Sequence, residues 1–399
     1  MANVSSSNGL EKRPKLRFPG FDEPWKEIKI GDIFKVTRGN VLSSALVSSE
    51  KSNGYTYPVF SSQTKDDGLM GYYNEFLFED AITWTTDGAN AGTVHFRKGK
   101  FYCTNVCGVL LNSYGYANRC IAEILGRVSK RYVSYVGNPK LMNNVMSEIC
   151  IYIPSLAEQS HIDDFLLVLD KKIEKQRQLV DSLKKYKRGV FEAIFSRKLR
   201  LVSKEEQRDW KIFKLSDFAS RIIRKNNGTT DIPLTISAQY GLIDQRDFFS
   251  KVVASADMSG YYLLRKGEYA YNRSTSNDYP FGSIKRLELY DKGAVSTLYL
   301  CFSVNENVMV NDFVKWYFES SQWYRSINEI CAEGARNHGL LNVPTDGFFN
   351  TTHILPTDTK EQTAIATFLS LIQEKLEISQ KGLNKLTELR NGLMQQLFI

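Results

Sequence analysis

The sequence predicts an α+β fold in which two mixed α/β globular modules are joined by two long coiled-coil helices, as an internal pseudo-two-fold repeat. Three observations predict it. An apolar heptad pattern runs through residues 158–198 and recurs without a gap 203 positions later, in residues 361–399. The start of each half also repeats, since Trp25, Ile30 and Asp32 match Trp210, Leu215 and Asp217 at an offset of 185. Between each tryptophan and its helix, short apolar runs alternate with turn residues, which is typical of β-strands.

These features divide the chain into six segments. Residues 1–18 are polar, and we expect a flexible N-terminus there. The remaining segments are a first module in 19–157, a central helix in 158–199, a joint in 200–209, a second module in 210–357 and a C-terminal helix in 358–399. The joint is short and charged rather than rich in glycine and serine, so we expect it to be ordered.

The two helices match position by position along their seams. The residues expected at the coiled-coil interface are Leu166, Leu169, Ile173, Leu183, Leu369, Ile372, Leu376 and Leu386. Two polar interruptions of the seam also match at the offset of 203, Gln176 with Ser379 and Lys187 with Arg390. Gly189 matches Gly392 in the same way. A glycine inside a helix costs about 1 kcal/mol relative to alanine. Its presence in both copies therefore predicts a close backbone approach.

Composition is that of a soluble globular protein, with 42% hydrophobic and 24% charged residues. The net charge of +8 is compatible with a nucleic-acid partner. The N-terminus lacks an apolar signal-peptide core, and no run approaches the roughly 18 apolar residues of a membrane span. We therefore expect a cytoplasmic protein without a membrane partner. The six cysteines form no CxxC pair, so we expect buried free thiols, and with four histidines no metal site.

Motifs of catalysis are missing from the sequence. It contains no G-x-G-x-x-G and no G-x-x-x-x-G-K-[ST] phosphate-binding loop. The Asn/Asp-Pro-Pro-aromatic tetrapeptide of amino-methyltransferases and a convincing nuclease cluster are missing too. The chain is therefore interpreted as a binding protein, with no catalytic residue and no cofactor of its own.

Three polar loops recur in both modules and are the candidate binding surfaces. In chain order they are residues 61–65, 85–90 and 138–144 in the first module, and residues 237–240, 272–278 and 334–342 in the second. Their side chains, Ser, Thr, Asn, Gln and Arg, are those that read base edges in DNA, although ordinary turns use the same residues. Each pair of loops keeps its position while its residues differ, as two readers of different sequences would. The candidates are Ser61, Gln63, Lys65, Thr85, Thr86 and Asn90 in the first module, and Gln239, Arg273, Ser274, Asn277, Arg336, Asn337 and His338 in the second.

Taken together, these features resemble the specificity subunit of type I restriction–modification systems. The resemblance rests on two variable modules, each followed by a proline and a Glu-Gln helix start, on the segment from Lys15 to Phe21, and on residues 334–340 ahead of Pro356. It implies that each module is a target recognition domain gripping one half of a split, asymmetric double-stranded DNA sequence. The helices would pair antiparallel, set the spacing and dock two methyltransferase subunits. Those subunits would carry S-adenosylmethionine, and restriction (translocase–nuclease) subunits would use ATP and Mg.

Two other functions remain open from the residues alone. One is a coiled-coil adaptor whose modules bind proteins; sequence-selective, salt-sensitive retention of DNA would exclude it. The other is a self-contained modification enzyme, which a titration with S-adenosylmethionine would detect.

Overall fold

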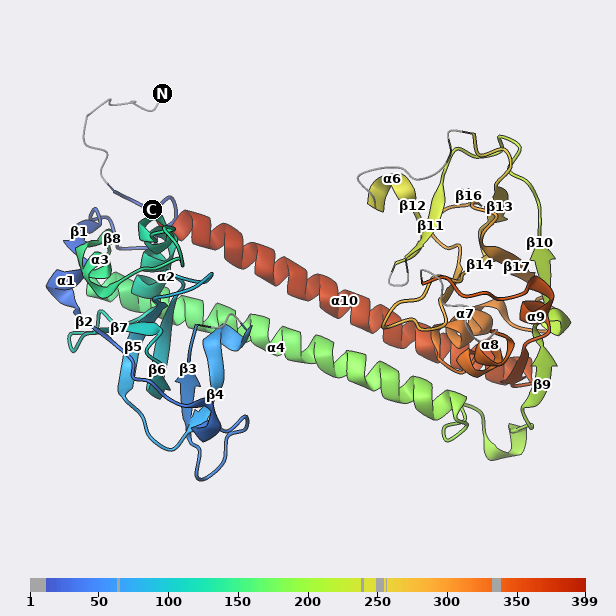
Figure 1. Cartoon of the computed structure of the whole chain (residues 1–399), viewed down its shortest axis with the longest axis horizontal. Coiled ribbons are helices and arrows are strands. Elements are labelled where there is room, and N and C mark those ends of the chain that lie inside the picture. Colours follow the sequence, from blue (N-terminus) through green and yellow to red (C-terminus); the bar gives the residue numbers. More distant parts are fainter. Residues whose placement is uncertain (1–11, 63–64, 238–239, 249–254, 256, 332–338) are drawn as a thin grey trace. The chain divides into compact units, whose positions relative to one another are not determined.

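A computed structural model describes residues 12–62, 65–237, 240–248, 255, 257–331 and 339–399. The chain forms two compact units (Figure 1). Unit 1 contains residues 1–178 and 381–399, and unit 2 contains residues 179–380. Each unit therefore holds one globular module, the beginning of one long helix and the end of the other.

Each module is built on a sheet with the same order of four strands. In unit 1 the order is β2 (Lys35–Arg38), β7 (Cys107–Leu111), β5 (Phe78–Thr85) and β6 (Val94–Cys103). In unit 2 it is β10 (Ala219–Ile222), β17 (Leu300–Val304), β14 (Tyr269–Asn272) and β15 (Ser283–Arg286). All neighbours in both sheets are antiparallel. The repeat seen at the start of each half thus extends through the sheet, where the residues themselves no longer match.

Beyond these four strands the modules differ. In unit 1, β3 (Tyr57–Phe60) joins β6 in parallel and β4 (Leu69–Tyr73) follows it, which gives six strands. In unit 2 the additional strands form separate two-stranded sheets. These are β11 (Leu234–Ser237) with β12 (Gly241–Asp244), and β13 (Tyr262–Arg265) with β16 (Lys292–Val295).

A short antiparallel ribbon closes each module and explains the matching tryptophan segments. It is β1 (Lys26–Lys29) with β8 (Cys150–Ile153) in unit 1, and β9 (Lys211–Lys214) with β18 (Thr352–Leu355) in unit 2. One-turn helices follow, α1 (Ile30–Ile33) and α5 (Leu215–Phe218). The Ile30 amide donates to the Ile149 carbonyl and the Leu215 amide to the Thr351 carbonyl, each at 2.9 Å.

Shorter helices pack against the sheets (Figure 1). In unit 1 they are α2 (Arg119–Val128) and α3 (Asn143–Glu148). In unit 2 they are α6 (Gln245–Phe248), α7 (Asn311–Glu319), α8 (Tyr324–Ile330) and α9 (Thr345–Phe349). Single 3₁₀ turns lie at Ser44–Leu46, Ser129–Tyr132 and Lys204–Glu206, the last within the joint. A tight turn with positive φ at Asp66 and Asp67 lies at Lys65–Gly68.

The two long helices are α4 (Leu156–Phe195) and α10 (Thr359–Leu397). Each begins with a Glu-Gln pair that is almost completely buried. Gln159 Nε2 donates to the Pro154 carbonyl at 2.9 Å, and Gln362 Nε2 donates to the Pro356 carbonyl at 2.8 Å. The two glutamine Oε1 atoms accept from the residue before the next helix, Asn118 in unit 1 and Val310 in unit 2. The repeated proline and Glu-Gln motif therefore fastens each long helix to its own module.

Most residues of the predicted coiled-coil seam are buried. Leu166, Leu169, Ile173, Leu183, Leu369 and Ile372 are buried, whereas Leu376 and Leu386 are half-buried. Two of the polar interruptions, Lys187 and Arg390, bond to the other helix. Arg390 Nε donates to Asp170 at 2.7 Å in unit 1, and Lys187 Nζ donates to Gln373 at 2.7 Å in unit 2. Both contacts fit one antiparallel register.

The end of each long helix enters the core of the module at which the other helix begins. In unit 1, Met394, Leu397 and Phe398 of the α10 segment pack with Trp25 and Ile162. In unit 2, Val190, Ile194 and Phe195 of α4 pack with the other core residues, including Trp210 and Ile365. Each core is thus completed by the end of the other long helix, at positions related by the offset of 203, Ile194 with Leu397 and Phe195 with Phe398.

Three expectations need correction. Residues 12–18 of the N-terminal segment that was expected to be flexible contact unit 1: the Leu16 amide donates to the Gln396 carbonyl at 2.9 Å, and Phe18 packs on the core. The thiols are not all buried, because Cys150 is exposed. The helix glycines are not approached closely by any described residue, because a Cβ added at Gly189 or Gly392 would meet none of their atoms within 4 Å.

Two further searches concern membranes and metals. In the described part of the chain, no helix has the length and apolar character needed to cross a membrane. Among the same residues, no three His, Cys, Asp or Glu side chains gather as metal ligands would.

Candidate functional site

The first module brings its three candidate loops together. The second loop follows β5 and pairs with the third, because the Leu141 amide donates to the Thr86 carbonyl at 2.8 Å and the Gly88 amide to the Pro139 carbonyl at 2.9 Å. The Trp84 side chain also holds this junction, since its Nε1 donates to the Leu141 carbonyl at 2.9 Å. Asn90 Nδ2 donates to the Ser62 carbonyl at 3.0 Å and so ties the first loop to the second.

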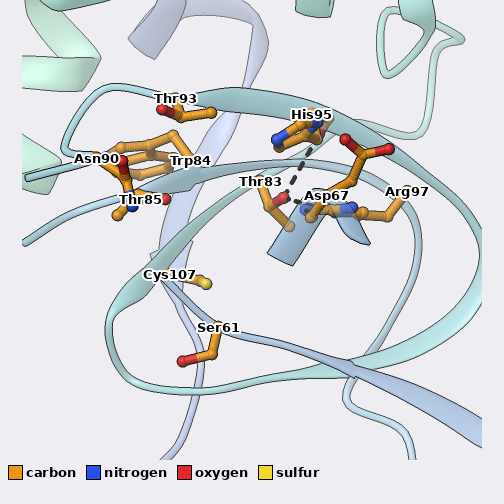
Figure 2. A pocket seen from close by; sticks show the side chains of 10 residues that line it. All are labelled: Ser61, Asp67, Thr83, Trp84, Thr85, Asn90, Thr93, His95, Arg97 and Cys107. Carbon is orange, nitrogen blue, oxygen red and sulfur yellow. Dashed lines mark hydrogen bonds between the residues drawn. The ribbon is translucent and has the colours of Figure 1, made fainter. Parts of the chain in front are cut away.

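The first and second loops border a pocket of about 230 Å³ (Figure 2). The sequence-predicted residues Ser61, Thr85 and Asn90 line it. Thr86 lies next to the pocket, is buried, and its hydroxyl donates to Asp87 at 2.6 Å. Lys65 is exposed in the turn after β3. Gln63 lies outside the described residues.

Two basic side chains of the pocket, His95 and Arg97 on β6, were missed from the sequence (Figure 2). Arg97 is only 8% exposed and lies over the Phe60 ring at 3.7 Å. Its Nε donates to Thr83 Oγ1 at 3.1 Å and its NH2 to the Asp67 carbonyl at 2.7 Å. The alternation of His95 and Arg97 on β6 with Thr93 just before it was the available signal, because alternate residues share a sheet face.

Burial lowers the pKa of both His95 and Arg97, but only His95 becomes neutral at neutral pH. It lowers the pKa of His95 to about 4, and the positive charge of Arg97 acts in the same direction. The imidazole is therefore neutral at neutral pH and offers one donor and one acceptor. Burial also lowers the pKa of Arg97 to about 10, so the guanidinium stays charged. The pocket thus presents hydroxyls, an amide, a neutral imidazole and a fixed cation, the groups that recognise polar edges of bases.

The second module repeats the junction between the second and third loops. The Leu341 amide donates to the Arg273 carbonyl at 3.0 Å, and the Thr275 amide donates to the Gly339 carbonyl at 2.7 Å. Ser274 and Leu340 form an isolated antiparallel bridge, as Asp87 and Lys140 do in the first module. A backbone junction of the same kind therefore presents different side chains in the two modules.

Arg273 has a structural role in this junction. Its NH2 donates to the Leu298 carbonyl at 3.0 Å and its NH1 to the Val343 carbonyl at 3.4 Å. Ser274 and Asn277 are exposed on the same loop. Arg336, Asn337 and His338 lie outside the described residues, as does Gln239.

The first pair of loops does not occupy equivalent places. Ser61 follows β3, which belongs to the main sheet, whereas Ser237 ends β11 in a separate two-stranded sheet. Tyr240, which follows Gln239, lines a hollow of about 290 Å³ with Lys285 and Lys315. Lys285 is paired there with Glu319 at 2.7 Å.

Comparisons with known proteins agree with this architecture. The family described as "Type I restriction modification DNA specificity domain" matches residues 22–185. From Mycoplasma pneumoniae, the putative type I specificity subunit S.MpnORF289P N-terminus is 37% identical over 144 residues, which are 35% of this chain and 75% of that protein. The putative subunit S.MpnORF507P is 32% identical over 199 residues, 49% of this chain and 52% of that protein. S.MpnORF285P is 33% identical over 156 residues, 38% and 50% of the two chains. The match thus spans about half the length of the latter two relatives.

Solved structures share the fold. The type I restriction–modification S subunit from M. genitalium superposes with a TM-score of 0.65 at 16% identity, over 97% of this chain and 99% of that one. A chain from a study of complex assembly in the type I R-M system gives a TM-score of 0.50 at 12% identity, over 96% and 99%.

Proposed function

Because the chain belongs to the family of type I restriction–modification specificity subunits, we propose that it is the non-catalytic, DNA-reading subunit of such a system. Each module would read one half of an interrupted, asymmetric target in double-stranded DNA. The long helices would set the separation of the halves and dock two methyltransferase subunits in the cytoplasm. S-adenosylmethionine would be bound by those subunits, and ATP and Mg by restriction subunits.

One observation carries the assignment of the reading surface. In both modules, the loop after the third strand of the common sheet joins a later loop through backbone hydrogen bonds, at Thr86 with Leu141 and at Arg273 with Leu341. Hydrogen bonds between backbone groups hold these two loops together without involving side chains. Side chains such as those of Asn277 and Thr93 can then differ between modules and change the bases recognised, while the frame stays the same.

The test is to express the chain with the methyltransferase subunit of its own system and map adenine methylation across a genome. We expect one two-part asymmetric sequence to be modified. Thr93→Val keeps the shape of a pocket-lining side chain and removes its hydroxyl. It should relax recognition in the first half-site only, since a good base contact contributes about 1–3 kcal/mol of discrimination. Methylation without any sequence preference would refute the proposal.

A further inference from the structure

A short hairpin with an apolar tip leads into the third loop of the first module. Ser134 and Lys140 close the hairpin, since the amide of each donates to the carbonyl of the other, at 2.8 Å and 2.9 Å. Between them, Tyr135 and Val136 are 69% and 92% exposed. The chain turns at Gly137, whose φ of +76° favours glycine. Isolated exposed apolar residues are ordinary, but turns usually carry small polar residues rather than two adjacent apolar ones.

The base of this hairpin is fixed to the module on both sides. Before it, Val133 is buried in the core of unit 1. At its end, Lys140 forms an antiparallel bridge with Asp87 of the second loop. The next residue continues this contact, because the Leu141 amide donates to the Thr86 carbonyl. The tip is therefore held at a defined place beside the loop to which we assign base reading.

Basic side chains accompany the apolar tip. Lys130 and Arg131 are exposed in the 3₁₀ turn Ser129–Tyr132, just before the hairpin. Such cations attract the phosphates of DNA without reading its sequence. An apolar protein partner would have to take these charges out of water, which is costly, whereas DNA phosphates neutralise them. The surroundings of the tip therefore favour DNA over an apolar protein surface as its partner.

The base edges of DNA offer one apolar group to such a tip. In the major groove, thymine carries its C5-methyl group, whereas guanine, adenine and cytosine present hydrogen-bond donors and acceptors. In the minor groove, every base pair presents donors and acceptors alone. Polar side chains of the neighbouring loop, such as Asn90, suit the donors and acceptors of the major groove. An apolar tip beside these polar side chains fits a thymine methyl group in the same groove.

Resting on the proposed function, we infer that the tip formed by Tyr135 and Val136 reads the methyl group of a thymine in the first half-site. Val136 is the more exposed of the two and supplies two methyl groups, while the ring of Tyr135 adds apolar area beside it. Contact with the thymine methyl group removes apolar surface of both partners from water, which is favourable. A base without this methyl group leaves the tip facing a polar edge.

The sequence of the second module does not repeat this apolar pair. Lys140 and Leu340 hold equivalent places, because each bridges to the second loop of its own module. Four residues before Lys140 stands Val136, and four residues before Leu340 stands Arg336. Arginine pairs with guanine rather than with a methyl group. The reading of a methyl group is therefore assigned to the first half-site alone.

The experiment uses the full chain co-purified with the methyltransferase subunit of its system, and duplexes that carry the target found by methylation mapping. In each duplex, one thymine of the first half-site, on either strand, is replaced by uracil. This removes the methyl group and keeps every hydrogen-bonding group of the base. Affinities are measured by fluorescence anisotropy at one fixed salt concentration. We expect uracil at one position of the first half-site to weaken binding about fourfold, the effect of one buried methylene-sized group.

Tyr135→Ser with Val136→Ser tests whether these side chains cause the preference. The double variant should bind the thymine and uracil duplexes equally, while its recognition of the second half-site stays unchanged. Tyr114→Ser is the matched control, because Tyr114 is 79% exposed and follows the end of β7 remote from Thr85. It should keep the fourfold preference for thymine. All three substituted residues are exposed, so melting temperatures should stay unchanged and show that the variants fold.

The outcomes separate this inference from the proposed function. If the unaltered chain and its partner modify no specific sequence, the proposed function fails and the inference with it. If they recognise a target but uracil has no effect anywhere in the first half-site, the inference fails alone. The same holds if the first half-site contains no thymine on either strand, or if the double variant keeps the preference for thymine. A double variant that no longer binds the methyltransferase subunit would assign the tip to a protein contact and overturn the inference as well.

Discussion

Arg17 donates to both carboxylate oxygens of Glu158, with Nε at 2.9 Å and NH2 at 2.6 Å. In unit 2, Arg200 likewise donates to both carboxylate oxygens of Glu361, through Nε and NH2. The glutamate side chains are 2% and 1% exposed, so each long helix begins with a buried charge neutralised by a residue from the segment that precedes its module. Residues 12–18 in unit 1 and the joint in unit 2 thus have the same role, which is to supply the arginine that neutralises the buried glutamate.

Arg17→Ala should therefore strongly destabilise the protein. Removing one partner of a buried ion pair leaves an unpaired buried charge and costs about 3–5 kcal/mol. Urea denaturation monitored by tryptophan fluorescence measures the change. Arg325→Ala is the control, because its partner Glu329 is exposed and such surface pairs contribute about 0–1 kcal/mol. Equal effects of the two substitutions would contradict the structural role of the buried pair.

His353 should make unit 2 sensitive to acid. It is buried between Tyr317 Oη and Thr351 Oγ1, each at 2.9 Å, and burial lowers its pKa from 6.5 to about 4. The unfolded chain binds a proton below pH 6.5 while the folded chain does not, so stability falls as the pH drops from about 6.5 to 4. The loss attributable to this group reaches about 3 kcal/mol.

This acid sensitivity can be measured by comparing unfolding free energies of the unaltered chain and His353→Gln. The difference between the two proteins should be constant from pH 7.5 to 9 and should shrink between pH 6.5 and 4.5. A difference that stays constant over the whole range would show that His353 is not the group responsible.

Substitutions at Arg273 and Asn277 should have different effects in the second module, the first on stability and the second on recognition of DNA. Arg273→Ala removes two hydrogen bonds to backbone carbonyls and should cost about 1–3 kcal/mol of stability. Asn277→Ala changes an exposed side chain on the same loop, so stability should stay within about 0.5 kcal/mol. Methylation mapping with the partner subunit should show relaxed recognition of the second half-site with Asn277→Ala. A changed first half-site would contradict the assignment of one module to each half.

Residues 1–203 alone should form a homodimer. This half chain lacks Leu397 and Phe398, which complete the core of unit 1, but it contains their counterparts Ile194 and Phe195. A second copy can supply them by antiparallel pairing of α4. Burying each of these side chains contributes about 1.5–3 kcal/mol, so dimers should persist at micromolar concentration.

Light scattering measures the mass of this half chain. Ile194→Asp with Phe195→Asp is the control and should abolish the dimer, because charges would then enter the core. With the methyltransferase subunit, the homodimer should modify a palindrome made of the first half-site. A folded monomer would show that the two helices are not interchangeable.

The sequence by itself determined the duplication, the helix positions and most of the seam. A coiled-coil helix repeats apolar residues every 3.5 positions, so its pattern can be read from neighbouring residues in the sequence. It also identified the loops around Thr86 and Arg273, which the structure joins to a later loop through backbone hydrogen bonds in both modules. It could not show that these loops meet residues 139–141 and 339–341, since that contact depends on which strands are neighbours in the sheet. Only the tertiary structure decided that Arg273 supports backbone carbonyls, that Arg17 neutralises Glu158, and that Gly189 and Gly392 face open space. Each of these depends on which residues are neighbours in space. The packing of the folded chain determines those neighbours, and spacing along the sequence does not.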